Sequence, residues 1–363
     1  NGILAPYNDD SGALSITARG AVSAEAGTGV YANNEVTESD LELVVGDVTG
    51  ADDAIRARNN EVGVQRITVT GKIMGGSGQG IDAATGAAGT TVITLASGAS
   101  VQAASGVAIR EGDGDSTVTV ETGAAVTGAI GLSGGADSLL FAGGDFSGVT
   151  DFDGGDGDTD LLAFGAGASG VLNASLVRGF ESVVFDDGSA VSVFDTLMAN
   201  VAVEAGALLS PGSSPGQLNI VGHLAVASGG TLNFELGGQS AGTEHDRIDV
   251  AGDAKLAPGA VFEIAGVGGF QGAPGEILDI LVADRIDVAS FSDLTFDFGG
   301  IGGTWEAGLA QVGGRDAVRL TQLPPVPTPV PVPVPLLLLG TGLACLAGVG
   351  RLRRSNPPRH PSA

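Results

Sequence analysis

Short apolar runs recur along the first 135 residues, separated by turns rich in glycine and other small residues. Alternating apolar and polar positions within such runs are typical of half-buried β-strands. A second apolar position follows each run after a small-residue turn. We call these recurring apolar positions landmarks. The first set, at the runs, is Ile16, Leu43, Ile67, Ile93 and Val118, and the second set, after the turns, is Val30, Ile55, Ile81, Val107 and Ile130. The repeat is about 25 residues long, which suits one coil of a parallel β-helix whose apolar faces stack.

The strand pattern continues beyond residue 135 with a shorter step. Apolar runs occupy residues 139–141, 161–163 and 183–185, and further strand-like runs lie at 201–203, 218–220, 232–234, 248–250, 261–263 and 277–279. No stretch before Thr321 has the apolar period of a capped helix. We therefore predict an all-β protein, a right-handed parallel β-helix or β-solenoid. Regular repeats span residues 1–135, and a second solenoid part with a cap spans 136–320.

The composition changes abruptly after residue 320. Residues 321–335 form a proline-rich spacer with alternating Val-Pro pairs, which favour an extended polyproline II conformation. Residues 336–350 are apolar and uncharged, and residues 351–363 contain arginines and no acidic residue. Arginines directly after an apolar run place that end in the cytoplasm. We predict a single transmembrane helix over 336–350, with a buried core helix as the alternative.

Acidic residues are confined to the part of the chain before the spacer. All 42 Asp and Glu residues precede Thr321, and the whole chain has a net charge of −26. Such a surface repels nucleic acid and anionic lipid, so neither is an expected partner of the body. Cys345 is the only cysteine, which excludes a disulfide framework and a cysteine-based zinc site. The chain begins at Asn1 without a signal region, and we expect a secretion signal to precede the mature protein.

Residues 209–218 read LSPGSSPGQL and are followed by a strand-like run and by GTLNFELG at 230–237. This segment resembles the SPG-x-L strand repeat of autotransporter passenger domains and related bacterial surface proteins. Together with FDGGDGDTDLL at 152–162, the resemblance covers roughly residues 135–260. It implies a β-helical body at the bacterial cell surface. It leaves the ligand open, because this fold carries many functions.

Two short motifs flank the apolar run. They are Val332, Pro333, Val334 and Pro335 before it, and Arg351, Arg353 and Arg354 after it. This order of parts resembles a PEP-CTERM sorting signal in its VPxPA-like variant, and differs from the membrane β-barrel that ends an autotransporter. The resemblance implies a membrane exosortase as the processing partner and cleavage near the proline motif. It also implies transient single-pass residence in the inner membrane, and delivery of the body to the cell surface or the extracellular space.

The densest acidic cluster is threaded with glycines, and its candidate calcium ligands are Asp153, Asp156, Asp158 and Asp160. Oxygen-rich, glycine-flexible turns suit Ca²⁺. The stretch GGDGD at 154–158 partly matches the calcium-binding nonapeptide pattern, and EGDGD at 111–115 repeats it more weakly. The alternative is a set of solvated turn aspartates that bind no metal. Calcium is the one cofactor that the sequence suggests.

Other candidate chemistry is sparse. His245 stands between two acidic residues and His223 lies in a strand-like run, which gives neither a catalytic triad nor a metal triplet. We therefore expect no catalytic residues. The sequence indicates a structural or adhesive surface protein of the envelope or biofilm matrix, with exopolysaccharide or other surface proteins as partners. The alternatives are a β-helical polysaccharide lyase or hydrolase, and a passive stalk.

Overall fold

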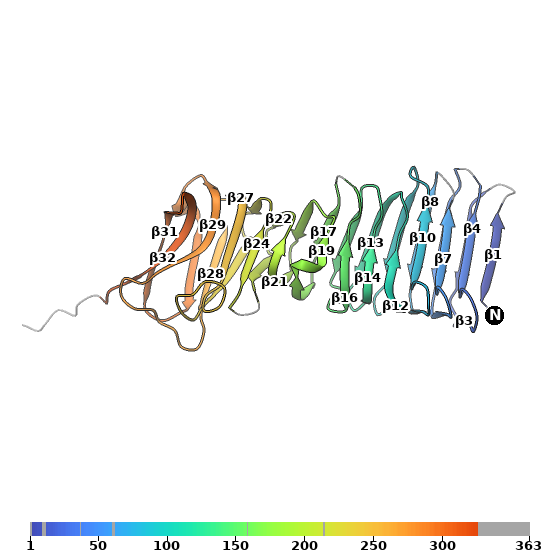
Figure 1. The fold of residues 1–363 in the computed structure, drawn as a ribbon, viewed down its shortest axis with the longest axis horizontal. Helices are drawn as coiled ribbons and strands as arrows, with labels where there is room; N and C mark the ends of the chain where they lie inside the picture. Colours follow the sequence, from blue (N-terminus) through green and yellow to red (C-terminus); the bar gives the residue numbers. More distant parts are fainter. Residues whose placement is uncertain are drawn as a thin grey trace, which may run out of the picture. The chain divides into compact units, whose positions relative to one another are not determined.

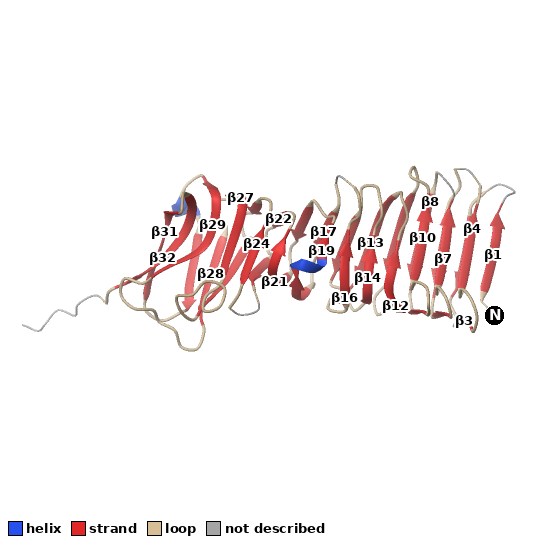
Figure 2. Ribbon diagram, viewed as in Figure 1, coloured by secondary structure: helices blue, strands red, loops and turns tan. Residues whose placement is uncertain are grey.

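The computed structural model describes residues 2–8, 12–36, 38–59, 62–157, 159–212 and 215–325. Apart from Pro325, these residues belong to one compact unit, Asn1–Pro324, in which strands stack coil upon coil (Figures 1 and 2). The predicted spacer beyond Pro325, the apolar run and the basic tail lie outside the described residues. No helix in the described ranges is long and apolar enough to cross a membrane.

The coils of the N-terminal half are three-sided. Face 1 contains β2 (Leu14–Ala18), β5 (Leu41–Val45), β8 (Val64–Val69), β11 (Thr90–Leu95), β13 (Asp115–Glu121), β15 (Ser138–Ala142), β17 (Leu161–Phe164) and β20 (Ser182–Phe185). Face 2 contains β3 (Val22–Ala24), β6 (Val48–Gly50) and β9 (Lys72–Gly75). Face 3 contains β1 (Ile3–Asn8), β4 (Val30–Asn34), β7 (Ile55–Asn59), β10 (Ile81–Thr85), β16 (Val149–Asp153) and β19 (Val177–Arg178). Two longer strands, β12 (Ser100–Arg110) and β14 (Ala125–Gly131), run through faces 2 and 3.

The coils of the C-terminal half are built from two sheets. Face 1 continues through β22 (Asn200–Val203), β24 (Gln217–Ile220), β25 (Leu224–Val226), β27 (Arg247–Leu256) and β29 (Ile277–Val288). The second sheet contains β18 (Ser169–Asn173), β21 (Ala190–Leu197), β23 (Leu208–Pro211), β26 (Thr231–Leu236), β28 (Val261–Gly266) and β30 (Thr295–Gly300). An antiparallel hairpin of β31 (Thr304–Val312) and β32 (Arg315–Leu323) pairs with β29. The only helical segments in the described ranges are the 3-10 turns η1 (Ala174–Leu176) and η2 (Phe291–Asp293).

The predicted all-β, parallel solenoid is confirmed, and the register of face 1 confirms the first set of repeat landmarks. Successive coils pair directly at Ile16, Leu43, Ile67, Ile93 and Val118. Farther along, Leu139 pairs with Leu162 and Leu162 with Val183. The middle run of this shorter repeat therefore begins one residue later than the apolar pattern predicts. The six later strand-like runs all lie in strands.

One landmark of the second set is wrong. Ile55 pairs with Ile81 on face 3, but Ile81 pairs with Ile109 and not with Val107. Strand β12 contains register shifts between Gln102 and Ile109, where additional residues bulge out of the ladder. The bulge moves the equivalent inward-facing position two residues along the chain.

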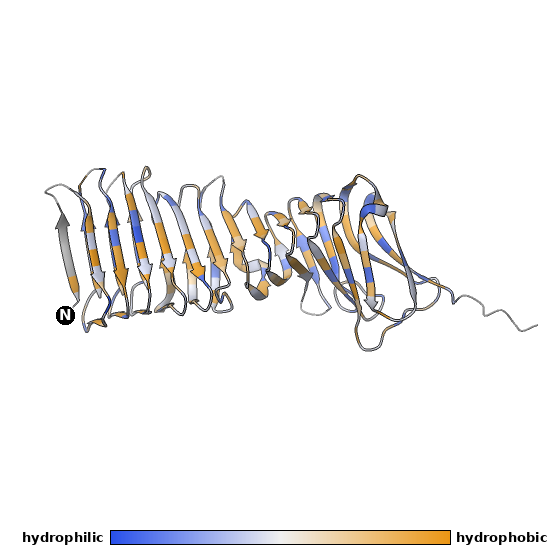
Figure 3. Ribbon diagram, turned by 180° about the vertical axis from the view of Figure 1, so that it is seen from behind, coloured by the Kyte–Doolittle hydropathy of each residue, from blue (hydrophilic) through white to orange (hydrophobic). Residues whose placement is uncertain are grey.

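The interior is apolar and continuous from coil to coil. Side chains alternate between interior and surface along the strands, as in β11, where every second residue is buried. Hydrophobic and hydrophilic residues accordingly alternate along many of the strands in Figure 3. Phe141, Phe164 and Phe185 pair in register on face 1, and their rings stack with centroids 5.8 and 5.5 Å apart. The phenylalanines of the middle coils thus fill the core as a column of stacked rings.

Candidate functional site

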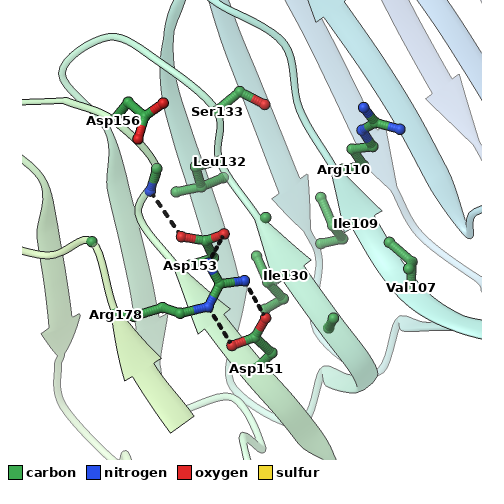
Figure 4. Close-up of a pocket in the computed structure, with 14 residues that line it drawn as sticks. Val107, Ile109, Arg110, Ile130, Leu132, Ser133, Asp151, Asp153, Asp156 and Arg178 are labelled. Atoms are coloured by element: carbon green, nitrogen blue, oxygen red, sulfur yellow. Dashed lines mark hydrogen bonds and ion pairs between the residues drawn. The ribbon is translucent and has the colours of Figure 1, made fainter.

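An open groove of about 510 Å³ lies on face 3, where β12, β14, β16 and β19 follow one another. Its non-polar lining combines small residues with larger aliphatic ones: Val107, Ile109, Ala129, Ile130, Gly131, Leu132, Gly155 and Gly179. Its polar lining consists of Arg110, Ser133, Asp151, Asp153, Asp156 and Arg178. In Figure 4, Arg178 lies between Asp151 and Asp153, and Arg110 stands apart from these three.

Outward-facing residues of face 3 form a column of alternating charge. Strand alternation places every second side chain on the surface, and the parallel register stacks equivalent positions from coil to coil. In order along the stack, the column contains Arg56, Asp82, Arg110, Gly131, Asp153 and Arg178. Three arginines and two aspartates give this column a charge of +1 (3 − 2), on a chain whose net charge is −26. We call these six residues the charge ladder.

At one end of the ladder, Arg178 is held by two aspartates of β16. Its Nη1 lies 2.6 Å from Asp153 Oδ2, and its Nε and Nη2 donate to Asp151 at 3.1 and 2.7 Å. The hydrogen bond to Asp151, with the charges of both aspartates, raises the pKa of Arg178. A two-pronged contact of this kind fixes the guanidinium in one orientation.

At the other end, two arginines of β7 share one aspartate. Arg56 Nε lies 3.3 Å from Asp82 Oδ2, and Arg58 Nη2 lies 2.5 Å from the same oxygen. Arg56 also pairs with the buried Asp53. These contacts leave Asp82 occupied on the side away from the groove.

Arg110 is the ladder arginine that has no ion pair within the described part of the chain. Its ladder neighbour on one side, Asp82, is held by Arg56 and Arg58, and its neighbour on the other side is Gly131. A Cβ added at Gly131 would meet nothing within 4 Å, so the surface above this glycine is open. The groove therefore has an exposed guanidinium on one side and a fixed Asp–Arg cluster on the other.

The structure distributes the predicted calcium ligands over two environments. Asp153 belongs to the ladder and is held by Arg178, while Asp156 is exposed and lines the groove. Asp160 is fully buried, and its Oδ1 accepts a hydrogen bond from the N–H of Asp137 at 2.8 Å. Asp158 lies outside the described residues. Where the structure describes the chain, no group of three or more Asp, Glu, His or Cys side chains is arranged to hold a metal ion.

The two glycine–aspartate motifs lie at the same corner of the coil, between face 3 and face 1, with the 132–137 loop between them. Loops of successive coils stack there, as shown by the 2.6 Å hydrogen bond from Ser133 Oγ to the carbonyl of Glu111. Glu111 and Asp137 are buried, each with 1% of its surface exposed. Burial raises the pKa of Glu111 to about 7, with the hydroxyls of Ser116 and Thr91 acting in the opposite direction. Burial likewise raises the pKa of Asp137 to about 6.

Both candidate histidines contact the backbone. His223 Nδ1 accepts a hydrogen bond from the N–H of Asp253 at 3.0 Å, and His245 Nδ1 lies 3.1 Å from the carbonyl oxygen of Gly238. Burial lowers the pKa of His245, which favours the neutral ring. Its neighbour Asp246 is buried, and burial raises the pKa of this carboxyl to about 7. These contacts give the histidines a structural role in the solenoid.

Sequence reasoning missed Arg110 and Arg178. Arg110 can be located in the sequence only if the inward-facing residues of successive coils are aligned correctly. Once Ile81 and Ile109 are equivalent, the residues that follow them fall into one outward column. Taking Val107 as the equivalent residue hides this column, because it puts Arg110 out of register.

No protein-family model matches the sequence, and no curated protein is significantly similar to it.

Proposed function

We propose that the protein is an exported bacterial surface protein with a structural or adhesive role in the envelope or the biofilm matrix. The observation that carries this proposal is the open groove with charged lining residues on face 3 of the stacked coils. Repeat folds present such surfaces because each coil packs only on its neighbours and leaves its outer face free. The acidic composition suits a protein that stays soluble outside the cell.

A polysaccharide-degrading enzyme is the second candidate, since such an enzyme would also use a groove on this kind of fold. Glycoside hydrolysis needs a protonated carboxyl beside a second, ionised one. Both aspartates of β16 in the groove are held by Arg178. Among the described residues, the carboxyls with a raised pKa are Glu111, Asp137 and Asp246, which are buried and do not line the groove. This separation favours binding over catalysis, and we propose no catalytic residues.

The tail is proposed to be a sorting signal. Residues 336–350 would cross the inner membrane as a single helix, with the C-terminus in the cytoplasm and the body outside. Arg351, Arg353 and Arg354 would stop transfer, because a charge at the bilayer centre costs roughly 2.5–3.5 kcal/mol on insertion scales. An exosortase-type membrane enzyme would then cut near residues 332–335 and pass the body to the cell surface or the extracellular space.

The winding of the coils is proposed to be right-handed. Crossover connections between parallel strands of one sheet are almost always right-handed, because a right-twisted strand packs back onto the sheet only in that sense. A crystal structure of the body would decide the hand directly.

Deletion of the gene in the producing bacterium tests the proposed role. The deletion strain is complemented with the intact chain, or with a chain in which Arg351, Arg353 and Arg354 are changed to glutamate. We expect the deletion to weaken cell–cell cohesion or matrix retention, and the intact chain to restore it. The glutamate variant should accumulate as uncleaved or misdirected precursor. Unchanged cohesion and matrix in the deletion strain would contradict the structural or adhesive role.

An activity assay of the purified protein on acidic polysaccharides distinguishes the two candidate functions. We expect no turnover of acidic polysaccharides. Turnover that a single Asp or Glu substitution abolishes would instead favour the enzyme.

A further inference from the structure

We infer that the groove binds an acidic polysaccharide, with the carboxylate of one sugar unit on Arg110. The inference deepens the proposed function, on which it rests for the presence of such a polymer around the protein. It is carried by the ladder arginine that has no ion pair among the described residues, and by the open surface above Gly131 within the same groove.

Arg110 stands where the ladder lacks an acidic partner. Asp153 and Arg178 are register partners on adjacent strands, and they form an ion pair of 2.6 Å. Arg110 has the same register relation to Gly131, which has no side chain. A carboxylate supplied by a ligand above Gly131 would restore the alternation of charge. Guanidinium groups bind carboxylates through two parallel hydrogen bonds.

Gly131 leaves a gap in the charge ladder between Arg110 and Asp153. This gap has room for one sugar ring with its substituents. Neighbouring strands lie about 4.8 Å apart, so Arg110 and Asp153, two strands apart, are separated by about 9–10 Å along the stack. Between them the groove lining includes the small residues Ala129 and Gly131. The exposed carboxylate of Asp156 lines the same groove and can accept hydrogen bonds from sugar hydroxyls.

A saccharide fits this surface better than a peptide does. Strands β12, β14 and β16 each have paired neighbours on both sides, so they offer no free sheet edge to an extended peptide. A free guanidinium beside carboxylate acceptors suits a ligand with one carboxylate and several hydroxyl donors. This is the composition of a uronic acid polymer.

The acidity of the chain does not exclude an anionic ligand at this place. The ladder itself has a charge of +1 (3 − 2), whereas the whole chain has a net charge of −26. The Debye length is about 8 Å at physiological ionic strength, so more distant acidic residues are largely screened. The groove lining itself contains two arginines and three aspartates. Because Arg178 is paired with Asp151 and Asp153, the guanidinium of Arg110 is the positive charge that a ligand carboxylate would contact.

Binding of uronic acid oligomers to the purified full chain, measured by calorimetric titration, tests the inference. Oligogalacturonate and alginate oligomers are the probes. Methyl-esterified oligogalacturonate is the matched control ligand, because it keeps the hydroxyls and loses the carboxylate charge. We expect the affinity of the ester to be at least about tenfold lower than that of the acid, because a hydrogen bond to a charged group contributes at least about that factor to binding. Polyglutamate is the peptide probe and should not bind.

Two substitutions at the gap separate recognition from folding. Arg110→Gln removes an exposed guanidinium, and Gly131→Asp places a carboxylate where the register pairs it with Arg110. The backbone of Gly131 lies outside the left-handed region and its surroundings are open, so the aspartate variant should fold. Both substitutions should weaken binding about tenfold or more. Gly131→Asn has nearly the shape of the aspartate variant without its charge, so it should weaken binding less. Arg66→Gln, on the exposed surface of β8, should leave the affinity unchanged.

Several results would overturn the inference. One is that neither uronic acid oligomer binds, and another is that the acid and its methyl ester bind equally. A third is that Arg66→Gln loses as much affinity as Arg110→Gln. The last is that polyglutamate binds and the saccharides do not. These results differ from failure of the proposed function, because Arg110→Gln keeps the tail and should reach the surface normally. A chain that binds the oligomers but never reaches the surface would contradict the proposed function and leave this inference standing.

Discussion

Glu111 and Asp137 are buried at a corner of the coil without a buried cation beside them. The buried polar and charged side chains of the described ranges include no Lys or Arg. An ionised carboxylate in such surroundings loses its hydration, so the protonated form is favoured and the pKa rises. The N–H of Ser116 donates to Asp137 Oδ1 at 2.7 Å, which opposes part of this effect. The fold therefore favours these two acids in their neutral form.

Mild acidification should stabilise the fold. The pKa of Glu111 rises from 4.5 in the unfolded chain to about 7 in the fold. Between these values the unfolded state ionises while the folded state keeps the proton, so the free energy of unfolding falls as pH rises. At about 1.4 kcal/mol per unit, Glu111 accounts for about 3 kcal/mol. Glu111→Gln should therefore raise the free energy of unfolding at pH 8 by about 2–3 kcal/mol and change it little at pH 4.5.

Urea unfolding at both pH values checks this expectation. Glu306→Gln, at an exposed position of β31, is the matched control and should leave the free energy of unfolding unchanged at both pH values. A Glu111→Gln protein that keeps the pH dependence of the wild type would show that burial of this carboxyl does not determine it.

Strands of the coil are joined at corners that require glycine. Gly98, between β11 and β12, has a φ of +79°, and Gly123 has a φ of +78° at the equivalent turn of the next coil. A buried alanine follows each of them, Ala99 and Ala124, and starts the turn into face 2. The left-handed conformation thus recurs from coil to coil, because it redirects the chain in a short turn.

Gly98→Ala should lower the free energy of unfolding by about 1–2 kcal/mol. A Cβ at Gly98 would meet nothing within 4 Å, so this loss comes from the backbone conformation alone. Gly131→Ala is the matched control, since its surroundings are equally open and its φ is not in the left-handed region. It should be neutral or slightly stabilising. Equal losses in the two variants, measured by urea unfolding, would contradict this explanation of the corners.

The strands were predictable because every apolar run faces one continuous interior. Recurrent positions such as Ile55 and Ile81 therefore locate the coils from the sequence alone. The register of β12 was not predictable, because its bulge adds residues without breaking the apolar pattern. The groove depends on that register, since Arg110 joins the ladder only when Ile109 is the equivalent of Ile81. Of the predicted calcium ligands, Asp153 and Asp156 line this groove, although their position there could not be inferred from composition.

Stability of the whole solenoid comes mainly from its continuous core, since each coil buries its apolar face on the next. Its surface arginines reduce the repulsion among acidic residues by pairing with aspartates of neighbouring strands. Such pairs involve Arg178, Arg285, Arg315 and Arg319. Exposed ion pairs contribute at most about 1 kcal/mol each, so they adjust the stability of the stack and do not determine it.

For the molecule as a whole, we propose that the chain is exported and sorted through its tail. Mass spectrometry of the protein recovered from the cell surface tests this most directly. Trypsin cuts after Arg319 and next after Arg351, because no Lys or Arg lies between them. We predict a C-terminal peptide that begins at Leu320 and ends near residues 332–335. A surface protein whose peptide runs on through residues 336–350 to Arg351 would show a permanent anchor and contradict the sorting mechanism.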